Sequence, residues 1–191
     1  MGSSYLANPL VFLIQTLFGL YAAAVLLRFL FQWVRADFHN PVSQFIARIT
    51  SPLLNPLRRV IPSGGKADLA SLVLAWLVKA AELLLVLSIS FGSFNPLGAL
   101  LWAIPELIDL AFGIFIWAII IQAILSWVAP GNYHPAARLV DQLVEPLMAP
   151  ARRMIPPIGG LDLSPMAVII GLTVLRMLVM PPLRMLTASP F

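Results

Sequence analysis

Two arginine pairs stand in matching segments of the sequence, and they are its most specific chemical feature. Arg58 and Arg59 lie within P-L-x-x-P-x-R-R-x-I-P, and Arg152 and Arg153 lie in a second copy of that pattern. A guanidinium group stays charged at physiological pH and matches the geometry of a phosphate. Because apolar residues precede each pair at helical spacing, we expect the arginines to bind anionic lipid headgroups or a protein partner at the membrane surface.

A second group of polar side chains interrupts long apolar stretches. Its members are Arg28, Lys79, Glu82, Asp109, Gln122 and Arg176. Ionisable groups at membrane depth are costly, so each is expected to have a partner. Two pairings are open from the sequence. In the first, Glu82 forms an ion pair with Arg176. In the second, Glu82 pairs with Lys79 three residues earlier, and Arg176 meets Asp109 or extends to the membrane surface.

Composition indicates the elements that carry these residues. Of the 191 residues, 60% are hydrophobic and 10% are charged, whereas a soluble domain has about 25% charged residues. Four apolar stretches are long enough to cross a hydrocarbon core of about 30 Å as helices. They run from about Pro9 to Val34, Leu69 to Phe91, Leu107 to Ala129 and Leu163 to Leu183. We therefore expect an all-α membrane protein with four transmembrane helices.

The stretch from Ser93 to Pro105 is apolar but too short to cross a membrane alone. It is either a separate interfacial helix or an extension of the third span, and the sequence does not distinguish these.

Basic residues predict how the spans are oriented. The segment between the first two spans has five Lys or Arg residues and the segment between the last two has three, while the tails and the middle segment have only Arg184. By the positive-inside rule both long loops are then cytoplasmic and both termini lie on the opposite side. Trp33 and Trp127 stand at the cytoplasmic ends of two spans, where an indole ring suits the headgroup level.

A shift of 94 residues superimposes the second half of the chain on the first. Residues 1–92 and 93–191 are thus two repeats of one membrane domain, each with a span, a cytoplasmic loop and a second span, so the repeats are parallel. Within each loop, prolines predict two short interfacial helices. The first helix is capped by Asn40 or His134, and Asp68 or Asp162 caps the span that follows. Aligned intramembrane positions are polar in both repeats, which predicts that they face the bundle interior.

Several classes of site are unfavoured. The chain has no cysteine and no nucleotide-binding glycine loop, zinc-ligand spacing or nucleophile-elbow pattern. His39 and His134 have no second ligand nearby. Nucleic-acid binding by the arginine pairs is unfavoured because aromatic platforms are absent. We therefore expect no enzymatic activity, no cofactor and no metal.

The repeated pattern W-V-x(6)-P, then P-L-x-x-P-x-R-R-x-I-P, then G-x-x-D-L resembles the YggT family of bacterial inner-membrane proteins and their plastid relatives. The resemblance covers about residues 9–183. It implies a multi-pass protein of the bacterial inner membrane without an established enzymatic activity. It also implies a connection with cell division and nucleoid distribution, with membrane cofactor assembly, or with osmotic stress through potassium uptake.

Two functions are consistent with these features. The first is a non-enzymatic adaptor or assembly protein whose arginine loops hold anionic lipid and present a surface to an unidentified protein partner. The second is a small ion channel or transport component, with potassium as the candidate ion, suggested by the intramembrane charges. Four spans also leave a homo-oligomer open.

Overall fold

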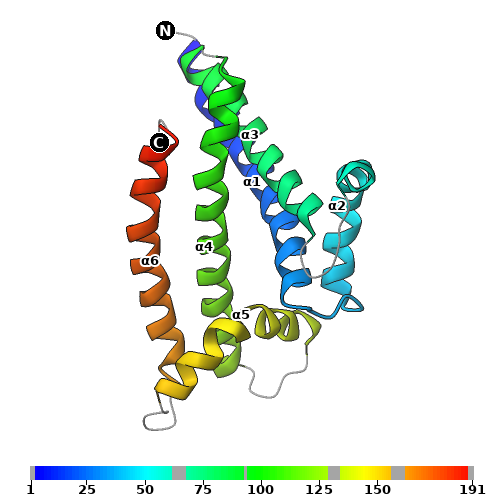
Figure 1. Ribbon diagram of the computed structural model, residues 1–191, viewed down its shortest axis with the longest axis vertical. Coiled ribbons are helices and arrows are strands. Elements are labelled where there is room, and N and C mark those ends of the chain that lie inside the picture. The colour runs from blue at the N-terminus through cyan, green and yellow to red at the C-terminus, as the bar shows by residue number, and fades with distance from the viewer. Residues whose placement is uncertain (1–2, 62–67, 93, 129–133, 156–161, 189–191) are drawn as a thin grey trace.

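Figure 1 shows the computed structural model, which describes residues 3–61, 68–92, 94–128, 134–155 and 162–188, apart from the side chains of residues 3–6 and 127. Six helices follow one another in this part of the chain. They are α1 (Ser3–Trp33), α2 (Pro41–Val60), α3 (Leu69–Phe91), α4 (Pro96–Val128), α5 (Pro135–Met154) and α6 (Ser164–Leu186).

Four of these helices, α1, α3, α4 and α6, are long and apolar enough to cross a membrane. The predicted all-α architecture with four spans is therefore confirmed. In Figure 1, α1 and α4 run from the end of the bundle that holds both chain termini towards the opposite end, and α3 and α6 run back. The two repeats are thus parallel, as predicted.

The apolar stretch before the third span is part of α4, which continues through Pro105 without a break. Asn95 Oδ1 accepts a hydrogen bond from the backbone nitrogen of Gly98 (2.9 Å), so the helix has an N-terminal cap just before Pro96. The extension is anchored sideways as well: Trp102 Nε1 donates to the backbone oxygen of Thr187 at the end of α6 (2.8 Å). Of the two readings left open, the extension is correct.

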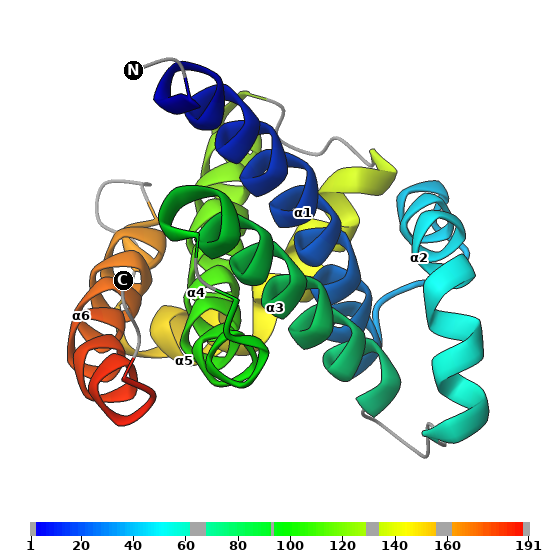
Figure 2. The same cartoon turned by 90° about the horizontal axis from the view of Figure 1, so that it is seen from above.

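Each long loop contains one bent helix, and the prediction of two short helices per loop is wrong. α2 and α5 are each 20 residues long and keep two prolines inside the helix. Pro52 lacks the N–H that would bond to the carbonyl of Arg48, which weakens the helix locally and permits a bend rather than a stop. The bend is visible in α2 in Figure 2 and in α5 in Figure 1.

The predicted caps of the bent helices are present. Asn40 Oδ1 accepts from the backbone nitrogen of Val42 (3.0 Å), and His134 Nδ1 accepts from that of Ala136 (3.3 Å). Asn40 Nδ2 also donates to the backbone oxygen of Pro135 (2.6 Å), which joins the starts of α2 and α5.

The caps of the second spans differ from the prediction. In the second repeat Leu163, and not Asp162, is the N-cap residue of α6, although Asp162 Oδ1 accepts a hydrogen bond from the backbone nitrogen of Ser164, the first residue of the helix (2.9 Å). Asp68 stands at the N-cap position of α3 but its side chain makes no capping bond. Its carboxylate is instead taken by two other side chains, described below.

The two repeats are packed to different extents. α1 packs along α3, α3 along α4 and α4 along α6, whereas within the described residues α6 contacts neither α1 nor α3. Figure 2 shows α6 at the edge of the bundle, separated from α3 by α4. Most buried apolar residues, including Val25, Leu54 and Leu74, therefore lie around the first repeat. The second repeat is the more open one.

The open packing of the second repeat predicts unequal effects of matched substitutions. Ala75 of α3 is fully buried, and its counterpart in α6 is Ile169, which is partly exposed. Ala75→Ile is expected to force α1 and α3 apart and to cost about 1–3 kcal/mol of unfolding free energy. Ile169→Ala is expected to cost less. Thermal unfolding in detergent measures both, and equal losses would contradict the asymmetry.

Candidate functional site

Arg28 joins the first span to the first bent helix. Its side chain is buried between α1 and α2. Nη1 donates to the backbone oxygen of Ala47 (2.9 Å) and to the hydroxyls of Thr50 (2.7 Å) and Ser51 (3.1 Å). This intramembrane cation is therefore satisfied by neutral acceptors of α2.

Gln122 has the matching place in the second repeat. It is buried, and its Nε2 donates to Asp141 Oδ1 of α5 (2.9 Å). Asp141 stands at the repeat position of Ala47, so both repeats anchor the first span to the same turn of the bent helix. The anchoring atom is a backbone oxygen in one repeat and a carboxylate in the other.

Lys79 and Glu82 pair with each other on α3. Lys79 Nζ donates to both carboxylate oxygens of Glu82 at 2.9 Å, and both side chains are almost entirely buried. Arg176 of α6 instead pairs with Asp109 of α4 through two parallel bonds of 2.6 Å. Of the two pairings considered, the one between Glu82 and Arg176 is wrong. The reason is that α4 lies between α3 and α6.

A second ion pair connects the same two helices and was not anticipated. Arg184 Nη2 donates to Glu106 Oε1 (3.2 Å). Glu106 and Asp109 are three residues apart in α4, so they lie on the same face of that helix. In α6, Arg184 follows Arg176 by eight residues, which is about two helical turns. That spacing is the sequence signal that could have revealed a ladder of two ion pairs between α4 and α6.

The first arginine of each repeated pair contacts the aspartate that begins the next span. Arg58 Nη2 pairs with Asp68 Oδ2, whose side chain is fully buried. The matching pair in the second repeat joins Arg152 Nε to Asp162 Oδ2 (3.3 Å), and both of its side chains are more exposed. In each repeat, the R-R motif therefore contacts the D-L motif through one arginine–aspartate ion pair. The sequence predicts only lipid or partner contacts for these arginines.

The second arginine of each pair, Arg59 or Arg153, is exposed at the end of its bent helix. Neither forms an ion pair within the part of the chain that the structure describes. Trp33 is also exposed and packs its ring edge-on against Phe29, with 5.6 Å between ring centroids. The side chain of Trp127 lies outside the description.

Asp68 has an unusually acidic carboxyl group. Burial raises its pKa, but hydrogen bonds from Arg58 and from the Ser71 hydroxyl, which lies at 2.6 Å, outweigh burial and hold the pKa below its ordinary value. The charged form of Asp68 is thus the one that the fold stabilises.

Loss of the ladder between α4 and α6 should detach α6. Asp109→Asn leaves the Arg176 guanidinium without a counter-charge at membrane depth, and we expect a loss of roughly 2–3 kcal/mol of unfolding free energy. Because Arg176→Gln breaks the same contact, the double variant should lose less than the two single losses added. Unfolding titrations in mixed micelles measure this, with Asp37→Asn as a control outside the spans. Additive losses would contradict the pairing.

The pair of Arg58 and Asp68 predicts a pH dependence. Since the pKa of Asp68 is lower in the folded chain than the value of about 3.9 for an unfolded one, its stabilisation is present in full above that value and is lost as pH falls through the folded pKa. Asp68→Asn should therefore be less stable than the parent protein at neutral pH, and the difference should shrink on acidification. Melting temperatures between about pH 6 and pH 3 test this. Parallel curves for parent and variant would contradict it.

Comparison with known proteins agrees with the repeat. The CCB3/YggT family model matches residues 7–89 and 101–183, so the second match begins 94 residues after the first. An uncharacterised protein of Pseudomonas aeruginosa is 49% identical over 94% of this chain and 92% of its own length. One of Vibrio alginolyticus is 46% identical, covering 86% and 90% of the two chains. The uncharacterised protein YggT of Escherichia coli K12 is 39% identical, covering 89% and 88%. No solved structure matches. The chain belongs to the CCB3/YggT family.

Proposed function

We propose that this protein is a non-enzymatic adaptor or assembly protein of the bacterial inner membrane. Its two bent helices face the cytoplasm and its termini the periplasm, as the distribution of Lys and Arg favours. Arg59 and Arg153 hold anionic lipid headgroups and help to present a surface to a protein partner. The observation that carries the proposal is the exposure of these two arginines at matching places, while the arginine before each is held by an aspartate.

The residues beside the exposed arginines support a place at the membrane surface. Val60 follows Arg59, Met154 follows Arg153, and each of these apolar side chains is 81% exposed. An exposed apolar side chain next to a guanidinium group suits the boundary between acyl chains and headgroups. The same arrangement at both bent helices favours one shared role over two unrelated ones.

The aspartate contacts give these arginines a defined direction. Arg58 and Arg152 tie the last turn of each bent helix to the start of the next span. Arg59 and Arg153 are the adjacent residues, about 100° further around the helix, so they point away from that contact. Positioned cations on a rigid helix are suited to recognising lipid phosphates or an acidic protein surface.

Ion transport has less support from the intramembrane charges that suggested it. Lys79 is neutralised by Glu82, and Arg176 by Asp109. Arg28 is held by the oxygen atoms of α2. These contacts suit a structural role for the charges, because Arg28 and Arg176 each join two helices and the charges of Lys79 and Glu82 neutralise each other within α3.

Replacement of the exposed arginines tests the proposal. Arg59→Gln combined with Arg153→Gln removes about 2 kcal/mol of attraction to anionic headgroups, and we expect at least a tenfold loss of co-purified phosphatidylglycerol and cardiolipin. Recovery of proteins crosslinked to the chain in cells should fall as well. The matched control is Arg48→Gln with Arg138→Gln, which removes two other exposed charges from the same helices.

Equal losses in both double variants would indicate attraction by net charge alone and would contradict the proposal. Unchanged lipid content and unchanged partner recovery would also contradict it. Potassium flux through the purified protein in liposomes would favour the transport alternative instead.

A further inference from the structure

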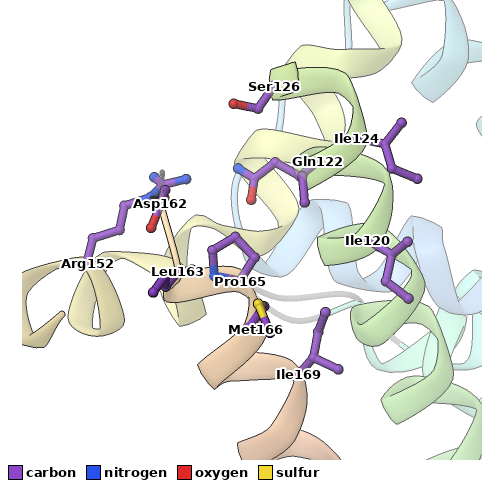
Figure 3. A pocket seen from close by; sticks show the side chains of 11 residues that line it. Ile120, Gln122, Ile124, Ser126, Arg152, Asp162, Leu163, Pro165, Met166 and Ile169 are labelled. Carbon is purple, nitrogen blue, oxygen red and sulfur yellow. Dashed lines mark hydrogen bonds and ion pairs between the residues drawn. The ribbon is translucent and has the colours of Figure 1, made fainter. Parts of the chain in front are cut away.

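The second repeat has a cavity that opens between α4 and the start of α6. Its volume is about 400 Å³, which is within the range of small-molecule sites. Figure 3 shows the apolar side chains of Ile120 and Ile169 on one side of the cavity, and the polar side chains of Gln122, Arg152 and Asp162 on the other. A cavity with apolar walls and charged groups at one end is complementary to a phospholipid, which has an apolar acyl chain and a charged headgroup.

Among the described residues, the matching positions of the first repeat are more closely packed. Phe29 stands where the second repeat has Ala123, and it is buried. Ala75 stands at the place of Ile169 and is also buried, since α1 packs directly along α3. The same positions are therefore closely packed in the first repeat and line a cavity in the second.

Gln122 brings an unused acceptor to the cavity. Its side chain is only 8% exposed, and within the described residues its Oε1 has no hydrogen-bond partner. Figure 3 shows its amide directed from α4 towards the start of α6, and its Nε2 is already taken by Asp141. A buried acceptor without a donor costs roughly 1–3 kcal/mol, so a ligand that donates a hydrogen bond there would be stabilised.

Comparison of the repeats indicates the charge of that ligand. In the first repeat the place of Gln122 is occupied by Arg28, whose guanidinium supplies a cation and several donors. In the second repeat that cation is missing, and two carboxylates appear where the first repeat has Ala47 and Ser51. They are Asp141 and Glu145.

The cation that remains at this site is already shared. Arg152 bonds to Glu145 through Nη1 (3.2 Å) and to Asp162 through Nε (3.3 Å). Acceptors and negative charge thus exceed donors and positive charge. The missing component is a cationic donor in the position that Arg28 fills in the first repeat.

We propose that this cavity binds a phospholipid with a primary ammonium headgroup, of which phosphatidylethanolamine is the common bacterial example. The ammonium group donates to Gln122 Oε1 and to the carboxylates of Asp162 and Glu145. The phosphate lies at the free edge of the Arg152 guanidinium, and an acyl chain runs along Ile120 and Ile169. This site uses a different lipid class and different residues from the arginine surface proposed above.

The chemistry also separates this lipid from its nearest analogue. Phosphatidylcholine has the same net charge, phosphate and chains, but its quaternary ammonium has no N–H donor. Proteins recognise quaternary ammonium groups with aromatic cages, and the described residues that line this cavity include no aromatic side chain. Phosphatidylcholine is therefore a matched control lipid that this cavity should bind poorly.

A competition between the two lipids tests the proposal. The full chain is purified in detergent with equal amounts of phosphatidylethanolamine and phosphatidylcholine that have identical acyl chains, and the bound lipids are measured by mass spectrometry. We expect about tenfold enrichment of phosphatidylethanolamine, which is the factor that one charge-assisted hydrogen bond supplies.

Two variants each introduce into the second repeat the residue that the first repeat has at the same position. Gln122→Arg places a guanidinium where the ammonium is proposed to bind, and Ala123→Phe fills the apolar part of the cavity. Each should abolish the enrichment, and melting temperatures identify which of them fold. Arg59→Gln with Arg153→Gln should keep it, so that failure of this site and failure of the arginine surface are distinguished. Equal binding of the two lipids by the parent protein, or full enrichment in a folded Gln122→Arg or Ala123→Phe variant, would overturn the proposal.

Discussion

Polar groups at membrane depth must find their partners within the protein, because lipid chains offer none. In this chain several of these contacts join two helices, whereas Lys79 and Glu82 pair within α3. Arg28 attaches α1 to α2, and Asp109 with Arg176 attaches α6 to α4. Apolar packing alone distinguishes poorly between one neighbouring span and another, since lipid is as apolar as the helices. The polar contacts therefore specify which helices are neighbours, and α6 depends on them most because little of its surface is buried.

The two repeats show how one template gives two packings. Both keep an anchor from the first span to the bent helix and an arginine–aspartate contact at the start of the second span. Small side chains at positions such as Ala75 let α1 and α3 pack closely, whereas α4 and α6 contact each other less extensively and are joined by two ion pairs. The closed repeat supplies most of the core. The open repeat is free to accommodate a ligand, and its acidic substitutions suit a cationic one.

Much of this fold follows from the sequence. Hydropathy predicts the four spans because a membrane demands long apolar helices, and the 94-residue repeat makes the halves parallel. Asn40 and His134 before proline predict the starts of the bent helices, since their side chains can accept from the first turn. The breaks predicted at the prolines are bends in the structure, because proline within a helix interrupts one hydrogen bond and leaves the rest of the helix intact.

The ion pairs were harder to predict from the sequence. Repeat alignment puts Glu82 and Arg176 at equal depth, but depth does not reveal that α4 separates their helices. Arg58 and Asp68 belong to different segments of the chain, one before and one after residues 62–67, and no helical periodicity relates them.

The direct test of the central claim is a proximity measurement on α6 in native membranes. The chain has no cysteine of its own, so a short bis-maleimide reports only on introduced pairs. With Asp109 and Arg176 intact, Glu106→Cys and Arg184→Cys should be bridged efficiently within one chain. Ser90→Cys with Arg184→Cys should not, although Ser90 of α3 is the residue that matches Arg184 in the repeat. Bridging of the second pair in preference to the first would place α6 against α3 and contradict the account.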